Sequence, residues 1–294
     1  MFLQQVLNGI TQGGTYALVA LGYTLIFGVL EIINMAHGDL FMVGAMVGWA
    51  LVTLLGWSLV PALLGGMLGA ALLGIVLEFT ALRPLRRQGG TNLSPLISTI
   101  GLGMVVQNLM VRATNGQPLS FRVPLSEGII RLGPLQLTRV QLVVLVVSLL
   151  LMAALQWTLS RTRLGRAVRA VSENPETAAL LGVNVSGIIL ATVMLAAALG
   201  GAAGVLVGLS FVSVSATMGL PYGLKGLAVI ILGGLGNVKG AVVGGLIIGV
   251  LEALTVAYGG AGYKDAVAFG FLFLMLLLRP QGLFGVSAAA TRRS

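Results

Sequence analysis

The segment at residues 33–39 carries the residue types that come nearest to a catalytic arrangement. It reads INMAHGD and holds the single histidine of the chain, two residues before Asp39. A histidine beside a carboxylate suits general acid–base catalysis, and inside a membrane the pair suits a proton relay. Alternatively, Asn34 and His37 line a substrate path. The interpretation we favour is structural: these side chains satisfy backbone groups at a helix start, where the charge of Asp39 is stabilised.

The rest of the sequence offers little to enzyme chemistry. The absence of cysteine excludes disulfides, thiolate metal sites and cysteine nucleophiles. No second histidine or carboxylate cluster provides metal ligands, and no serine lies in a nucleophile-elbow pattern. The phosphate-binding pattern GxxxxGK[ST] is also missing, so the chain cannot bind ATP in that manner. We therefore expect no catalytic residue, no metal and no cofactor.

The composition identifies an integral membrane protein. Of 294 residues, 57% are apolar and 9% charged, and the mean hydropathy is +1.03. A soluble domain has about 25% charged residues, so a soluble globular enzyme is excluded. The 43 glycines fit this class, since glycine lets membrane helices approach closely.

Apolar runs predict an all-α, polytopic bundle of about eight transmembrane helices, since a crossing needs roughly 20 apolar residues. The runs are 7–30, 40–55, 59–82, 94–111, 140–160, 186–210, 241–258 and 266–278, and a shorter one at 227–235 predicts a half-helix or re-entrant segment. We expect residues 1–294 to form a single transmembrane domain. Glycine pairs four residues apart, such as Gly44 with Gly48 and Gly245 with Gly249, predict close helix contacts.

The net charge of +9 is best explained by topology. Arginines gather at 83–87, at 161–169 and at 279–293, which the positive-inside tendency places in the cytoplasm. The segment 112–139, despite its four arginines, and residues 1–5 then lie outside. Acidic lipid headgroups of the bilayer are a sufficient partner for this charge. We expect no nucleic-acid binding.

Polar and glycine-rich stretches interrupt the apolar pattern near both ends of the chain. They are the residues from Asn8 to Thr15, the 33–39 segment, and 217–226, which contains Pro221 and precedes the glycines of 233–245. Such breaks are tolerated in protein interiors or along wet cavities, and paired breaks are typical of translocation sites. We predict a path lined by Asn8, Gln12, Thr15, Asn34, His37 and Glu252.

Two carboxylates lie in or near apolar runs, where an unpaired charge is costly. We expect Glu78 to form an interfacial ion pair with Arg83. Glu252 has no basic neighbour in sequence, so it either pairs with a group from another helix or faces a cavity.

Residues 161–183, RTRLGRAVRAVSENPETAALLGV, predict a short amphipathic cytoplasmic helix. Ser172 would cap it, Pro175 would open it, and Glu173 and Glu176 suit its first turn. Gly182 would end it. A plain surface helix and a docking helix for a soluble partner both fit this pattern.

Seven segments, in this order and spacing, resemble the permeases of branched-chain amino acid ABC importers, in particular the LivH-type subunit. They are GGTYALVALGYTLIFGV (13–29), INMAHGD (33–39), GRAVRAVSENPETAALLGV (165–183), LGGLGNVKGAVVGG (232–245), LEAL (251–254), YKD (263–265) and RPQGLFG (279–285). The resemblance implies a multi-pass subunit of the bacterial inner membrane. Its implied partners are a homologous second permease, two ABC ATPase subunits and a periplasmic substrate-binding protein.

The resemblance also makes residues 161–183 a coupling helix that contacts the ATPase. Glu176, Ala178 and Gly182 match the Glu-Ala-Ala, three residues, Gly pattern of ABC importers, while Thr177 departs from it. The coupling residues we expect are Arg166, Arg169, Glu173, Asn174, Pro175, Glu176, Ala178, Ala179 and Gly182. The function implied is inward transport of branched-chain amino acids by alternating access, driven by ATP hydrolysis on a separate subunit.

Other functions fit the residues less well. Related permeases serve urea or short amides, and nothing in residues 8–15 separates these substrates. A stand-alone channel or ion-coupled carrier would need polar groups at mid-membrane, for which Glu252 is the one candidate. An intramembrane enzyme would need a nucleophile beside His37 and Asp39.

Overall fold

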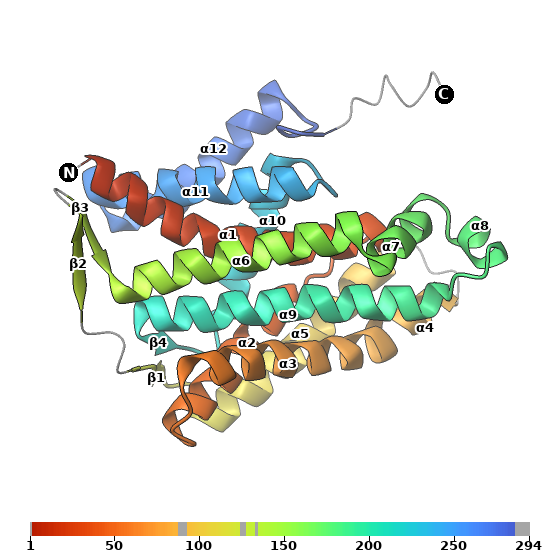
Figure 1. The fold of residues 1–294 in the computed structure, drawn as a ribbon, viewed down its shortest axis with the longest axis horizontal. Helices are drawn as coiled ribbons and strands as arrows, with labels where there is room; N and C mark the ends of the chain where they lie inside the picture. The colour runs from red at the N-terminus through yellow and green to blue at the C-terminus, as the bar shows by residue number, and fades with distance from the viewer. Residues whose placement is uncertain (1, 88–92, 124–127, 133–134, 286–294) are drawn as a thin grey trace.

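The computed structural model describes residues 2–87, 93–123, 128–132 and 135–285, and it is almost entirely helical (Figure 1). The helices are α1 Phe2–Leu30, α2 His37–Thr53, α3 Leu59–Leu77, α4 Arg83–Arg87, α5 Ser94–Thr114, α6 Arg139–Arg161, α7 Arg163–Glu173, α8 Pro175–Leu180, α9 Val185–Phe211, α10 Gly219–Gly233, α11 Val238–Tyr258 and α12 Lys264–Leu278. A π-helical turn, Glu78–Leu82, joins α3 to α4, and a 3₁₀ turn, Ala261–Tyr263, precedes α12.

Short strands close one end of the bundle. β1 (Leu119–Ser120) pairs antiparallel with β4 (Ser213–Val214), and β2 (Ile129–Leu132) pairs antiparallel with β3 (Leu135–Thr138). In Figure 1 these strands lie on the left, and α4, α7 and α8 lie on the right. Many of the arginines are on α4 and α7. From the positive-inside tendency we expect the right-hand end to be cytoplasmic and the strand end to lie outside.

Seven helices within the described residues are long and apolar enough to cross a membrane, and α2 and α10 are shorter apolar helices. This confirms a polytopic helical membrane protein with about eight transmembrane helices. Leucines on one face of α3, namely Leu64, Leu68 and Leu72, are exposed and recur every four residues. Such a stripe is the expected lipid-facing surface.

The core of the bundle is built on α1 and α9. In the most apolar stretches of these two helices, 83% and 67% of the residues are buried. Glycines let the helices touch backbone to backbone. A methyl group on Gly13 would lie 2.7 Å from the carbonyl oxygen of Gly245, so α1 and α11 are in contact there. Gly44 of α2 and Gly201 of α9 meet in the same way. The close contacts predicted from the glycine spacing are therefore confirmed.

The expected break in the opening helix is wrong, because α1 runs without interruption from Phe2 to Leu30. The hydroxyls of Thr11 and Thr15 donate to the carbonyl oxygens of Leu7 and Gln12, 3.0 and 2.7 Å away. These bonds satisfy the polar side chains within the helix itself.

The expected irregular stretch at 217–226 is also wrong, because α10 begins at Gly219. Pro221 lies in its first turn, where the missing N–H breaks no helical bond. Residues 227–233 of the predicted short run form the second half of α10, and the run's last two residues follow this helix. Its 15 residues span about 22 Å, which is less than the hydrocarbon core of about 30 Å.

The predicted break at 33–39 lies between α1 and α2, and it lets α2 begin deep in the bundle. His37, the first residue of α2, packs against Gly22 and Gly200. Gly38 lies against the backbone of Gly219 and Gly223, so the starts of α2 and α10 meet.

Candidate translocation site

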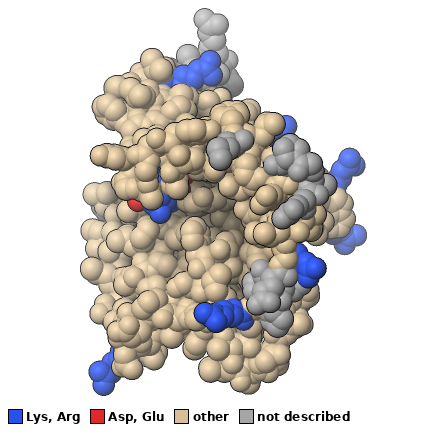
Figure 2. Space-filling view, turned by 90° about the vertical axis from the view of Figure 1, so that its left-hand side faces the viewer, with Lys and Arg blue, Asp and Glu red and all other residues tan. Residues whose placement is uncertain are grey.

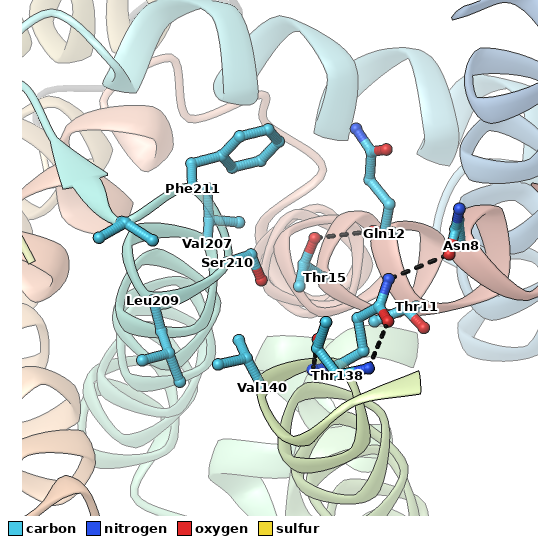
Figure 3. Close-up of a pocket in the computed structure, with 12 residues that line it drawn as sticks. Asn8, Thr11, Gln12, Thr15, Thr138, Val140, Val207, Leu209, Ser210 and Phe211 are labelled. Atoms are coloured by element: carbon cyan, nitrogen blue, oxygen red, sulfur yellow. Dashed lines mark hydrogen bonds between the residues drawn. The ribbon is translucent and has the colours of Figure 1, made fainter. Parts of the chain in front are cut away.

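A cavity of about 430 Å³ lies at the strand end of the bundle, between α1, α6 and α9. One side is polar and comes from α1 and the start of α6, and the other is mostly apolar and comes from the end of α9 (Figure 3). Seen from this end, the molecule is hollowed near the middle of its face, and most of its surface is uncharged (Figure 2). The lining residues are Asn8, Thr11, Gln12, Thr15, Thr138, Val140, Gln141, Val207, Leu209, Ser210, Phe211 and Val212.

Hydrogen bonds fix the polar wall at Asn8. Its Oδ1 accepts from Nε2 of Gln141 at 3.0 Å and from Nε2 of Gln4 at 3.2 Å. Gln141 is held in turn by Thr138, since the two form the capping box at the start of α6. The sequence prediction placed Asn8, Gln12 and Thr15 together, and all three line this cavity.

Behind Gln12 lies a buried charge cluster. Nε2 of Gln12 donates to the Tyr16 hydroxyl at 2.6 Å, and that hydroxyl donates to Oε2 of Glu252 at 2.6 Å. Nζ of Lys225 lies 2.7 Å from Oε1 of Glu252 and 2.9 Å from Oδ1 of Asp265. Of the two alternatives for Glu252, pairing with a group from another helix is therefore the one observed. Glu252 does not line the outer cavity itself but contacts Gln12, which does.

Sequence reasoning missed Lys225, although a signal was present. The side chains of Lys225 and Glu252 are 8% and 1% exposed, and buried charges persist in proteins only when they are paired. Lys225 is the one charged residue of α10. A lone lysine in one apolar segment and a lone glutamate in another each carry a high free-energy cost when unpaired in a membrane. Their pairing could therefore have been proposed from the sequence.

Asn34 and His37 lie apart from the outer cavity. Oδ1 of Asn34 accepts from the N–H of Ala36 at 3.1 Å, just before α2 begins. The His37 ring is fully buried, and its centroid lies 4.5 Å from that of Tyr23. The Asn34 hydrogen bond agrees with the structural interpretation of this segment. His37 does not, because neither of its ring nitrogens has a hydrogen-bond partner within the described part of the chain. Among the described residues no three His, Cys, Asp or Glu side chains gather in a metal-ligating group.

The expected pair of Glu78 with Arg83 is wrong, because Glu78 pairs with Arg86. Nη1 of Arg86 lies 3.1 Å from Oε2 of Glu78, and Nη2 contacts the other carboxylate oxygen. Arg83 instead places its guanidinium over the ring of Phe79, 5.1 Å from the centroid. The π-helical turn at Glu78–Leu82 shifts the helical register, and Arg86, eight residues on, faces the carboxylate.

Residues 161–183 form two helices, α7 and α8, where one was expected. Asn174 caps α8 by accepting from the N–H of Thr177 at 2.8 Å, so the expected cap at Ser172 is wrong. Ser172 sits inside α7 and donates to the carbonyl oxygen of Arg169. Asn174 lies between the end of α7 and the start of α8 and has an extended backbone. A cap residue needs such a non-helical backbone, and Ser172, inside α7, does not have it.

Gly182 ends the segment in the left-handed conformation, with φ +85°. Its N–H donates to the carbonyl of Ala179, and that of Val183 donates to Ala178, which satisfies the end of α8. Ala178 is buried, whereas the other predicted coupling residues are exposed, namely Arg166, Arg169, Glu173, Asn174, Pro175, Glu176, Ala179 and Gly182. The adjacent Leu180 is 87% exposed.

A polytopic helical bundle with a polar-lined cavity at one end and an exposed helix at the other fits a membrane permease. Residues 5–277 match the family described as branched-chain amino acid transport system, permease component. The chain belongs to this family.

Individual relatives agree with the family match. The chain is 38% identical to the high-affinity branched-chain amino acid transport system permease protein BraD of Pseudomonas aeruginosa, over 97% of this chain and 96% of the relative. Identity to LivH of Escherichia coli K12 is also 38%, with the same coverage. The ribose import permease protein RbsC of E. coli K12 is more distant, at 25% identity over 94% of this chain and 85% of RbsC. No solved structure matches significantly.

Proposed function

We propose that this chain is the transmembrane permease subunit of an ABC importer that moves branched-chain amino acids inward across the bacterial inner membrane. Residues 1–294 would form one transmembrane domain, with its coupling loop at 161–183. The outer cavity supports an amino-acid substrate with an aliphatic side chain. It has the volume of a small-molecule site, a polar wall at Asn8, Gln12 and Thr15, and an apolar wall at Val207 and Leu209.

The family match supports a proposed set of partners. A homologous second permease completes the transmembrane unit, two ABC ATPase subunits dock beneath it, and a periplasmic binding protein delivers the substrate at the strand end. The observation that carries the docking proposal is the exposed surface of α8, with Leu180 and Leu181 at 87% and 78% exposure. Apolar side chains exposed at the arginine-rich end suit a soluble partner.

ATP-driven closure of the ATPase pair would push on α7 and α8. The transmembrane helices would then tilt about their glycine contacts, and the outer cavity would close as an inward path opens. This chain hydrolyses no ATP in the proposed mechanism, because the nucleotide belongs to the partner subunits.

Co-purification from native membranes tests the proposal. The wild type should carry an ABC ATPase pair and a second permease, and Gly182→Arg should lose the ATPase because it places a bulky charge on the docking surface. Gly260→Arg is the matched control. Both glycines have positive φ and no neighbour within 4 Å, but Gly260 lies at the strand end.

Reconstitution in liposomes separates the rival functions. Leucine uptake that needs ATP and the binding protein agrees with the importer. A chain that purifies alone and conducts or transports without ATP contradicts it, and supports a channel or secondary carrier. Uptake of urea or a short amide in place of leucine would keep the importer and change the substrate.

A further inference from the structure

A second cavity, of about 150 Å³, lies between α1, α2, α5 and α10. Its lining includes Asp39, Gln107, Gly219 and Leu224. A water needs only about 10–15 Å³ of such space, so the cavity admits a polar head group with several attached atoms. It is separate from the outer cavity, with which it shares no lining residue.

This cavity lies near the middle of α5, a helix long and apolar enough to cross the membrane. The Asp39 carboxylate packs against Gly103, which is the tenth residue of the 21-residue helix α5. A side chain at Gly103 would collide with the carboxylate, and a methyl group on Gly219 would lie 3.2 Å from Oδ1 of Asp39. The carboxylate is therefore accommodated by bare backbone on two neighbouring helices.

Asp39 is half-buried and has no cationic partner in the part of the chain that the structure describes. Its place in the first turn of α2 favours the negative charge, but that gain is smaller than the cost of a carboxylate at the bilayer centre. Lipid cannot supply the missing interaction, so we expect this opening between α5 and α10 to face a wet path.

We propose that Asp39 binds the ammonium group of the amino-acid substrate as it passes the middle of the membrane. This inference rests on the proposed function and adds a substrate contact to it. The carboxylate supplies a negative charge and hydrogen-bond acceptors for the ammonium. Ile100, Met104 and Leu224 line the same cavity and provide an apolar wall for the aliphatic side chain.

Cysteine labelling tests the site directly, because the chain has no cysteine of its own. Leu224→Cys places a thiol in the cavity, and Leu68→Cys places one on the exposed face of α3 as a control. The complete importer is treated in opened native membranes with a cationic or an anionic methanethiosulfonate reagent. Modification of this chain is read by mass spectrometry.

We expect Leu224→Cys to react while Leu68→Cys does not. The cationic trimethylammonium-ethyl reagent should react about threefold or more faster than the anionic sulfonato-ethyl reagent, and leucine should slow both. Adding Asp39→Asn should remove the charge preference and the protection by leucine.

Transport gives a second readout. Asp39→Asn should lower leucine uptake by about tenfold or more, the size of one lost charge-assisted hydrogen bond, while the subunits still co-purify. Glu31→Gln is the control, since it removes an exposed carboxylate outside the helices.

Three outcomes would overturn the inference. An unreactive Leu224→Cys means that lipid or a partner subunit covers the cavity. If the labelling rate of Leu224→Cys changes neither with leucine nor with Asp39→Asn, Asp39 has a purely structural role in α2. Loss of subunit assembly in Asp39→Asn, with unreactive Leu224→Cys, assigns the carboxylate to a partner's cation. Failure of the unmodified importer to take up leucine counts against the proposed function instead.

Discussion

The buried charges of Lys225 and Glu252 are paired across helices that lie far apart in the chain. Glu252 receives hydrogen bonds from Tyr16 and Gln12 and an ion pair from Lys225. Tyr16 and Glu252 are 236 residues apart. Nζ of Lys225 also lies 5.3 Å from the Tyr16 ring centroid, a cation–π contact. The cluster ties α1, α10, α11 and α12 together behind the outer cavity.

Removing one member of the buried pair should destabilise the protein strongly. Lys225→Met leaves the buried Glu252 carboxylate without its cation, and Glu252→Gln removes the buried carboxylate that pairs with Lys225. We expect each variant to lose about 3–5 kcal/mol in the free energy of unfolding. The double variant should lose less than the sum of the two single losses. Thermal unfolding of the detergent-purified complex measures all three.

Asp265→Asn is the control for this cycle. The Asp265 side chain is 55% exposed, so its removal should cost about 0–1 kcal/mol. Additive losses in the Lys225 and Glu252 variants would show that the two side chains are not coupled.

At the scale of elements, bare glycine backbone sets how closely the helices pack. Gly13 and Gly245 hold α1 against α11, and Gly44 and Gly201 hold α2 against α9. The proposed tilting of helices would occur at these contacts, which have no side chains to interlock.

Glycine substitutions within α1 should therefore differ by position. Gly13→Ala would put a methyl group 2.7 Å from the carbonyl oxygen of Gly245, so α1 and α11 must separate. Gly28 has nothing within 4 Å, and Gly28→Ala should be neutral or stabilise the helix by up to about 1 kcal/mol. We expect a lower unfolding temperature and lower uptake for Gly13→Ala alone. Equal behaviour of the two variants would argue against backbone contact as the cause.

The whole molecule has two unlike ends. The strand end holds the amphipathic cavity, and the other end carries α4, α7 and α8 with many of the arginines (Figure 1). Four further arginines lie in the segment 112–139, which includes the strands β1 to β3, namely Arg112, Arg122, Arg131 and Arg139. The difference in positive charge between the two ends is therefore small, and charge alone is a weak predictor of the orientation.

Cysteine accessibility tests this orientation. Gln117 and Glu176 are both exposed and lie near opposite ends of the bundle. With the outer membrane made permeable, an impermeant maleimide should label Gln117→Cys in otherwise intact cells, and Glu176→Cys only after the inner membrane is opened. Labelling of Glu176→Cys from outside would reverse the orientation and remove the docking role of α8.

The sequence by itself determined the properties that depend on neighbouring residues. Hydropathy over about 20 residues predicted the membrane class and most of the spans. Glycines four apart predicted helix contacts, and the pattern from Ser172 to Gly182 predicted a short helix that ends at Gly182, although with the wrong cap. Asn8, Gln12 and Thr15 share one helix, and this explains why they could be placed in one site.

Tertiary structure alone decided which groups from distant segments meet. It brought Lys225 to Glu252 and joined the starts of α2 and α10 at Gly38 and Gly219. Hydropathy and helical periodicity are local properties, whereas these pairings come from the packing of whole helices, which no local pattern specifies.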